Sequence, residues 1–182
     1  MKPTTAKRYD PVMRFFTPEL FLRFNSADDS EAEIAGKEWD AALAAYREHL
    51  DDIPCDVKGF ADLGLHDAEL YADSQPVEPL CPLPFESFGH PRMAMLALKR
   101  RDEFVSLAYS LWDRIREHPS PANWPFSKDR THWLYDEVHR SSSDPQCGFF
   151  HRILLSDGRI LEIPFASATR HRLPLPAAVA VS

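Results

Sequence analysis

Two short apolar segments around an Asp-Gly pair constrain the fold of this chain more than any other feature. The segments cover residues 149–155 and 159–165, and Ser156, Asp157 and Gly158 lie between them. Apolar segments that flank an Asp-Gly pair are the strongest short-range signal for a β-hairpin. The chain is therefore expected to contain an antiparallel sheet.

Two registers of this hairpin are open, and they differ in the side chains that face the core. A two-residue loop would place Leu155 opposite Ile160. A three-residue loop, with Gly158 in the left-handed region, would place Arg152 opposite Glu162. We prefer the second register because it pairs these opposite charges on one face. The other face would then carry Phe149, Ile153, Leu155, Leu161, Ile163 and Phe165.

His151 and Pro164 indicate the surroundings of the hairpin. In the preferred register His151 points into the apolar face, where a histidine is more often a hydrogen-bonded core residue than a catalyst. Pro164 has no backbone N–H, and proline in sheets is found mainly in edge strands, at strand starts and at bulges. The strand that contains Pro164 is therefore expected to lie at the edge of the sheet or to end there.

The size and composition are those of a cytoplasmic globular protein of one domain. The chain has 182 residues, of which 44% are hydrophobic and 27% are charged, and this length can bury one good core. No apolar segment approaches the length of a membrane span, and the start has no apolar signal-peptide core. The cysteines Cys55, Cys81 and Cys147 form no Cys-x-x-Cys pair, so neither a zinc site nor a disulfide framework is expected.

The charge and the motifs exclude several classes of function. A net charge of −7 argues against a general nucleic-acid binder, which needs a basic face. The compact basic group at residues 99–101 is followed directly by Asp102 and Glu103 and is interpreted as a solvated turn. There is no glycine-rich phosphate loop and no Gly-x-Ser-x-Gly motif, so no nucleotide or other cofactor is predicted.

The N-terminal part of the chain predicts helices. Residues 1–12 are polar and unpatterned and are interpreted as a disordered extension, with Met13 as an alternative natural start to Met1. Thr17 is expected to cap a short helix. A longer helix is expected after Asp28, since acidic residues favour a helix start, and a third short helix over residues 56–63. The longer helix has an apolar stripe of Trp39, Leu43, Tyr46 and Leu50 and stops at Ile53 and Pro54.

The rest of the chain predicts strands. Residues 65–71 and 132–139 are expected to be strands, and the last strand continues after Phe165 to Leu173. Residues 93–111 are ambiguous: one apolar spacing fits a helix, but the alternation from Val105 to Leu111 favours a strand that pairs with residues 95–98. Loops are expected at three places. The first contains Pro76, Pro79, Pro82, Pro84 and Pro91, the second contains Pro119, Pro121 and Pro125, and the third covers residues 141–145.

Helices first and strands afterwards indicate an α+β fold. We expect one domain over residues 13–173, in which the N-terminal helices cover one face of an antiparallel sheet of about six strands. Residues 174–182 are expected to form a loose tail.

Three segments together carry a resemblance. They cover residues 13–26, which contain Phe-Thr-Pro-Glu-Leu, residues 65–68, which read Leu-His-Asp-Ala, and residues 133–138, which read Trp-Leu-Tyr-Asp-Glu-Val and are followed by the hairpin. The chain resembles a family of small bacterial proteins of unknown function. More loosely, it resembles immunity proteins of bacterial toxin systems. The resemblance implies a bacterial cytoplasmic protein and supplies no catalytic residues.

Histidines and carboxylates on the predicted strands are the candidates for chemistry. His66 and Asp67 lie in the first predicted strand, Glu137 and His139 share one face of another, and His151 lies in the hairpin. Such residues can form a metal site or an acid–base pair. Each also has a structural interpretation as a turn or ion-pair residue, since Asp136 and Glu137 can pair with Arg140, Arg152 or Arg170. No metal-binding spacing such as His-Glu-x-x-His is present, and no metal is predicted.

Three hypotheses about function follow. The leading one is a non-catalytic domain that binds another protein, through an exposed sheet face, proline-rich loops or exposed aromatic residues near Trp124, Phe126, Trp133 and Tyr135. The alternative is a small metal-dependent or acid–base hydrolase, which requires the five candidate side chains to meet in one cleft. The third is a homodimer formed along the strand that contains Pro164. A membrane or nucleic-acid partner is not expected.

Overall fold

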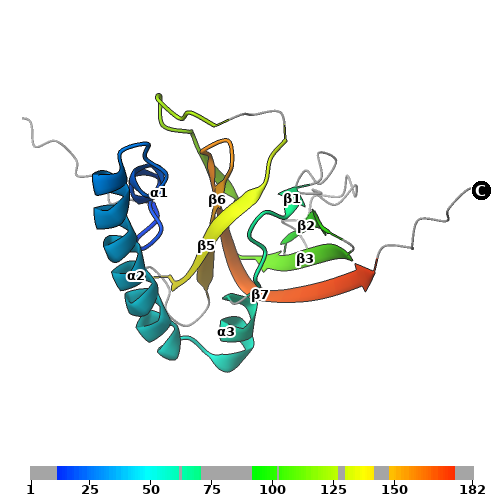
Figure 1. Cartoon of the computed structure of the whole chain (residues 1–182). Helices are drawn as coiled ribbons and strands as arrows, with labels where there is room; N and C mark the ends of the chain where they lie inside the picture. The colour runs from blue at the N-terminus through cyan, green and yellow to red at the C-terminus, as the bar shows by residue number, and fades with distance from the viewer. Residues whose placement is uncertain are drawn as a thin grey trace, which may run out of the picture.

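The computed structural model describes residues 12–61, 63–70, 92–101, 103–126, 130–141 and 148–174 (Figure 1). Within these residues the predicted α+β architecture is confirmed, with three N-terminal helices and an antiparallel sheet. The helices are α1 (Pro18–Phe24), α2 (Asp29–Asp51) and α3 (Cys55–Ala61). The strands are β1 (Glu69–Leu70), β2 (Arg92–Arg100), β3 (Glu103–Leu111), β4 (Arg116–His118), β5 (Trp133–Arg140), β6 (Phe149–Leu155) and β7 (Ile160–Pro174).

The first two helices begin where the sequence predicts because side chains satisfy their free backbone N–H groups. The Thr17 hydroxyl accepts a hydrogen bond from the Leu20 N–H at 3.2 Å, and Pro18 occupies the first helical position. The Asp28 carboxylate accepts hydrogen bonds from two N–H groups in the first turn of α2. The third predicted helix, over residues 56–63, is confirmed as α3 with slightly different bounds.

The described strands form one sheet in the order β1-β2-β3-β7-β6-β5, with β4 paired to β7. This is one strand more than predicted. The ambiguous segment forms the strands β2 and β3 and not a helix, because these two strands pair along their full lengths. Val105, Leu107 and Tyr109 are fully buried while the residues between them are partly exposed. The alternation of large and small side chains was therefore the correct signal.

The hairpin of β6 and β7 has the predicted three-residue register. Arg152 lies opposite Glu162, and Leu154 lies opposite Ile160. Gly158 has a φ of +85°, in the left-handed region that the loop requires. The Nε group of Arg152 donates to the Glu162 carboxylate at 2.9 Å, so the two charges that favoured this register form an ion pair.

β7 is not an edge strand, and the prediction made from Pro164 is wrong. The strand continues from Ile160 to Pro174 and lies between β3 and β6. On the side away from β6, β4 pairs with residues 160–162 and β3 pairs with residues from Phe165 onward. Pro164 falls between these two ladders, at a position where the missing N–H of proline is tolerated. Residues 160–165 have β6 on one side and β4 and β3 on the other, so the homodimer hypothesis that assumed an edge strand near Pro164 loses its basis.

The predicted strand over residues 65–71 is correct only for the two residues of β1 within the described part of the chain. A turn precedes β1, in which Asp67 has a φ of +64°. The Asp67 N–H donates to the Trp133 carbonyl and the Leu70 N–H donates to the Thr131 carbonyl, each at 2.8 Å. Because β1 also pairs with β2, this segment joins both ends of the sheet and closes its curl.

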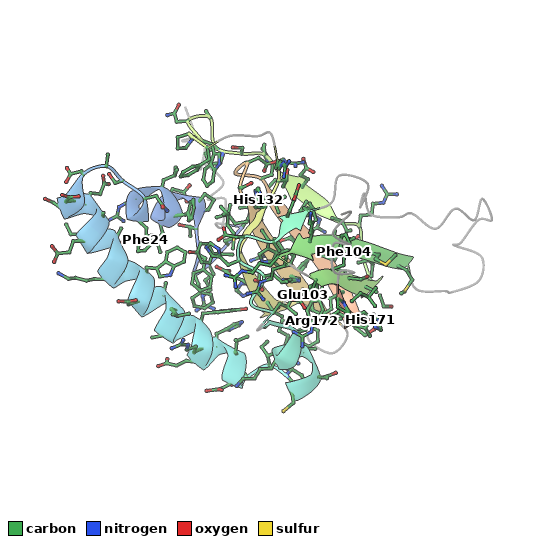
Figure 2. The ribbon with its side chains drawn as sticks, turned by 45° about the vertical axis from the view of Figure 1, so that its right-hand side comes forward. Phe24, Glu103, Phe104, His132, His171 and Arg172 are labelled. Carbon is green, nitrogen blue, oxygen red and sulfur yellow. The ribbon has the colours of Figure 1, made fainter. Side chains whose placement is uncertain are left out.

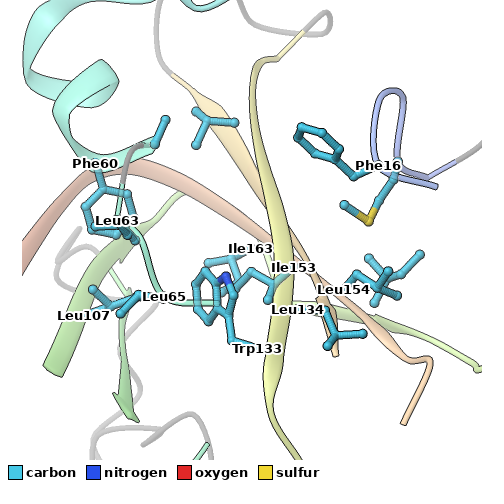
Figure 3. Packing of buried hydrophobic residues seen from close by; sticks show 14 of the residues in the cluster. Phe16, Phe60, Leu63, Leu65, Leu107, Trp133, Leu134, Ile153, Leu154 and Ile163 are labelled. Atoms are coloured by element: carbon cyan, nitrogen blue, oxygen red, sulfur yellow. The ribbon is translucent and has the colours of Figure 1, made fainter. Parts of the chain in front are cut away.

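β5 separates two layers of buried side chains (Figure 3). On one side, within the curled sheet, Trp133, Leu107 and Ile163 pack near Phe60 of α3. On the other side, Phe16 packs against Trp39 of α2, so that α1 and α2 cover the outer surface of the strand. From Tyr135 onward, successive residues of β5 therefore belong to different cores, because side chains alternate between the two faces of a strand, and a register shift between Trp133 and Tyr135 interrupts this alternation.

Several predictions fall on residues outside those described. They concern residues 1–11 and the choice between Met1 and Met13, the proline-rich connection at 71–91, most of the predicted turn at 141–145 and the tail after Pro174. Val12 belongs to the predicted extension, but in the structure it is partly buried against the core.

Candidate functional site

The five candidate side chains do not meet in one site. Within the sheet, Val138 lies opposite His151, so His151 shares the inner face of the curl. Glu137 and His139 point to the outer face, toward the helices. His66 and Asp67 lie in the turn before β1. The candidates therefore form three separate groups, which we describe in turn.

Glu137 anchors the segment before α1. Its side chain is fully buried, and its carboxylate accepts hydrogen bonds from the backbone N–H groups of Arg14, Phe15 and Phe16 at 2.8, 2.6 and 2.5 Å. The Nε2 atom of His139 lies 2.7 Å from the same carboxylate. All acceptor positions of the two oxygens are used, so Glu137 holds the chain in place and is not available as a base.

His49 of α2 also belongs to this group, although no sequence motif points to it. Its ring lies 5.0 Å from the ring of His139, and its Nε2 atom lies 3.1 Å from the Val138 carbonyl. Burial and the neighbouring His139 hold the pKa of His49 below its ordinary value. Its position three residues after Tyr46, on the apolar stripe of α2, was the signal that could have identified it.

His151 lies in a buried polar chain inside the curled sheet. Its Nε2 atom lies 3.1 Å from Asp136, and its Nδ1 atom lies 3.0 Å from the Tyr109 hydroxyl. A carboxylate only accepts, so Nε2 donates to Asp136, and in the tautomer that carries its proton on Nε2 the Nδ1 atom accepts from the Tyr109 hydroxyl. Asp136 also accepts from the Trp133 indole N–H at 2.9 Å. Burial raises the pKa of Tyr109 well above its ordinary value, which keeps this hydroxyl protonated.

His66 and Asp67 form the exposed group. The His66 Nδ1 atom lies 3.0 Å from the Asp67 carboxylate, and its Nε2 atom lies 3.2 Å from the Tyr135 hydroxyl. The side chains of His66 and Asp67 are 48% and 78% exposed. Burial, together with the charge of Asp67, raises the pKa of Tyr135. This group can exchange protons with water, but the other candidate residues lie elsewhere in the fold.

Metal binding receives no support from these groups. Within the described residues, no three histidine, cysteine, aspartate or glutamate side chains are placed to hold an ion. Cys55 is exposed, and the other two cysteines lie outside those residues.

The expectation of exposed aromatic residues is mostly wrong. Trp133 is 1% exposed and Trp124 is 9% exposed, because Trp133 lies inside the curled sheet and Trp124 packs on Phe21 of α1. Tyr135 is half-buried against Trp39. Of the four predicted positions, Phe126 alone is exposed. The aromatic side chains are thus mainly core material.

An exposed sheet face is present, however, on β2, β3 and β7. We call it the open face; α3, which contacts β7, packs through Phe60 on the opposite face of the sheet, against Tyr109 and Phe165. Met93, Met95 and Leu173 on this face are 49%, 46% and 61% exposed. The pairing register places the following alternate residues on it: Met93, Met95, Ala97, Lys99, Phe104, Ser106, Ala108, Ser110, Ser167, Thr169, His171 and Leu173.

The open face contains no carboxylate among these residues, although the chain has 28 aspartates and glutamates. Figure 2 shows Phe104 and His171 at the end of the sheet away from α2, whereas Phe24 lies beside α2. The middle strand contributes the small residues Ser106, Ala108 and Ser110. The arrangement can bind an apolar surface, and Lys99 and His171 are its only groups capable of acid–base catalysis.

Comparison with protein-family models, with curated proteins and with solved structures finds no match to this chain. In the described part of the chain, no helix combines the length and apolar character needed to cross a bilayer.

Proposed function

We propose that this protein is a non-catalytic protein-binding domain and that its open face contacts the partner. One observation supports the proposal most: Met93 and Met95 on one strand and Leu173 two strands away are exposed on the same sheet face. A solvated sheet face normally carries polar side chains. Exposed apolar patches on soluble proteins commonly mark interaction sites, and methionine adapts well to varied partners.

The same proposal includes neutralisation of a bacterial toxin, which is the form suggested by the resemblance to immunity proteins. Such a function needs a surface that covers the partner and requires no catalytic group. The polar groups of the structure agree with a binding function, since Glu137 and His151 are buried and hydrogen-bonded within the fold.

Affinity capture with three baits tests the proposal. The baits are the full chain, the variant Met95→Lys and the matched control Ile34→Lys. Ile34 is also an exposed apolar residue, at 54%, but it lies on α2 away from the open face. We expect the full chain and Ile34→Lys to capture the same protein from bacterial lysate, and Met95→Lys to capture at least tenfold less, since a lysine must be desolvated at the contact.

Calorimetry with the purified captured protein then measures whether binding is direct. The proposal fails if no captured protein depends on Met95, or if Met95→Lys and Ile34→Lys bind the purified partner equally.

A further inference from the structure

We infer that the open face binds a second copy of this chain, so that the protein forms a two-fold symmetric dimer through β2, β3 and β7. The inference rests on the proposed function, because it names the partner of the same surface. In a two-fold dimer each copy presents the same patch, and the patch must complement itself in charge and in shape.

The charge distribution favours a second copy. Two chains of net charge −7 repel each other over most of their surface. The twelve residues of the open face include no carboxylate, and the one with a full charge at neutral pH is Lys99, which lies opposite Glu69 of the neighbouring strand β1. Figure 1 shows α2 on the opposite side of the molecule from β2 and β3. The exposed acidic residues of α2 and its caps are Asp28, Asp29, Glu31, Glu33, Glu38, Asp40, Glu48, Asp51 and Asp52.

Contact through the open face therefore keeps these acidic helices at the two far ends of the dimer. A strongly charged partner of another kind would find little opposite charge on this face. A second copy needs none, because half of the residues of the open face are apolar and four of the other six are serine or threonine.

The shape of the open face is also complementary to itself. Met93 and Met95 project from β2, next to the small side chains of Ser106, Ala108 and Ser110 on β3. A two-fold rotation places the methionines of one copy over the small residues of the other, and the reverse contact forms at the same time. Methionine is suited to this contact because it is unbranched and flexible.

The size of the face predicts a weak dimer. Strands of nine residues are about 30 Å long, and three strands spaced about 4.8 Å apart cover a width of about 15 Å with their side chains. The planar area is then roughly 450 Å² on each copy and roughly 900 Å² in total, below the roughly 1,000 Å² expected of a stable specific interface. Association should therefore depend on concentration in the micromolar range.

Sedimentation equilibrium of the full chain, from micromolar to several hundred micromolar, tests the inference. We expect the mass to rise from the monomer value of 20.8 kDa toward twice that value. Met95→Lys should remain at the monomer mass, and Ile34→Lys should associate like the unaltered chain. Raising the salt concentration should strengthen association, because salt screens the repulsion between two acidic chains.

The inference is overturned if the unaltered chain stays monomeric at the highest concentration, or if Met95→Lys associates equally well. Circular dichroism checks that each variant is folded, and Met95→Thr, which keeps strand propensity, replaces Met95→Lys if that variant unfolds. A monomer that still captures another protein through Met95 rejects the dimer and keeps the proposed function. A monomer with no Met95-dependent capture rejects both.

Discussion

Glu137 is buried, and four hydrogen bonds determine its charge. Burial acts to raise the pKa of this carboxyl, but hydrogen bonds from His139, from the Phe16 N–H and from the Arg14 N–H outweigh it, and the pKa lies below its ordinary value. The ionised form is therefore the stable one in the folded protein. One residue of β5 thus fixes the segment that leads into α1.

Replacing this carboxylate should destabilise the fold in a pH-dependent way. Glu137→Gln should lower the free energy of unfolding at pH 7 by about 2–4 kcal/mol, because an amide cannot accept all four hydrogen bonds. The folded pKa is depressed, so this stabilisation is complete above the unfolded pKa and is lost as the pH falls through the folded pKa. Urea denaturation at pH 7 and at successively lower pH values should show the two proteins converging; a constant difference would contradict the assignment.

Gly158 is required for both its conformation and its contacts. A Cβ atom here would lie 2.6 Å from the ring of Trp124, and φ is +85°. Gly158→Ala should lower the free energy of unfolding by about 2–4 kcal/mol, because alanine is strained in the left-handed region and its Cβ atom overpacks the site. The control is Gly64→Ala, where φ is +57° and no atom lies within 4 Å, so only strain of about 1–2 kcal/mol is expected. If thermal unfolding shows that Gly158→Ala and Gly64→Ala lower stability equally, the packing argument is contradicted.

At the scale of elements, α2 protects the outer edge of β5. The Tyr46 hydroxyl accepts from the Val138 N–H at 2.9 Å, and His49 lies within hydrogen-bond distance of the Val138 carbonyl. Nearer the start of β5, the segment at residues 67–70 pairs with it. Helix side chains and one short segment thus occupy backbone groups that an exposed edge strand would offer to other chains.

Removing one hydroxyl should test this protection. Tyr46→Phe should lower stability by about 1–3 kcal/mol, since it leaves the buried Val138 N–H without that acceptor. Amide hydrogen exchange should accelerate at Val138 more than elsewhere in β5. In the control Tyr135→Phe, the lost hydroxyl contacts the exposed His66, and the change should stay within about 0.5 kcal/mol. Unchanged exchange at Val138 would show that α2 does not protect this edge.

For the whole molecule, the closed curl means that most strands share one interior. Phe60 of α3 contacts the rings of Tyr109, His151 and Phe165, which come from β3, β6 and β7. These strands and the helix therefore depend on a common set of contacts, and we expect them to unfold together.

Truncation of this side chain should reveal that dependence. Phe60→Ala should lower the free energy of unfolding by about 3–5 kcal/mol, because it leaves a cavity in the shared interior. Near-ultraviolet and far-ultraviolet circular dichroism should lose their signals at the same denaturant concentration. Phe24→Ala is the matched control, because Phe24 is 40% exposed and its loss should cost about 1 kcal/mol. Two separate transitions for Phe60→Ala would contradict a single cooperative unit.

Local features of the chain were predictable because their causes are local. The hairpin register follows from Gly158 and from the charges of Arg152 and Glu162, and the helix starts follow from Thr17 and Asp28. In each case, residues a few positions apart satisfy one another, so no knowledge of distant segments is needed. The α+β class and the burial of His151 in an apolar face follow from the same patterns.

The arrangement of distant parts depended on the tertiary structure. The position of Pro164 in an interior strand depends on a change of partner from β4 to β3, and the closure of the sheet depends on hydrogen bonds between residues 67–70 and 131–133. The pairing of β5 with β6 decided that Glu137 and His151 lie on different faces of the sheet. The packing of the helices decided that Met95 is exposed. Apolar patterning shows which side chains require burial, but long-range contacts select the segments that cover them.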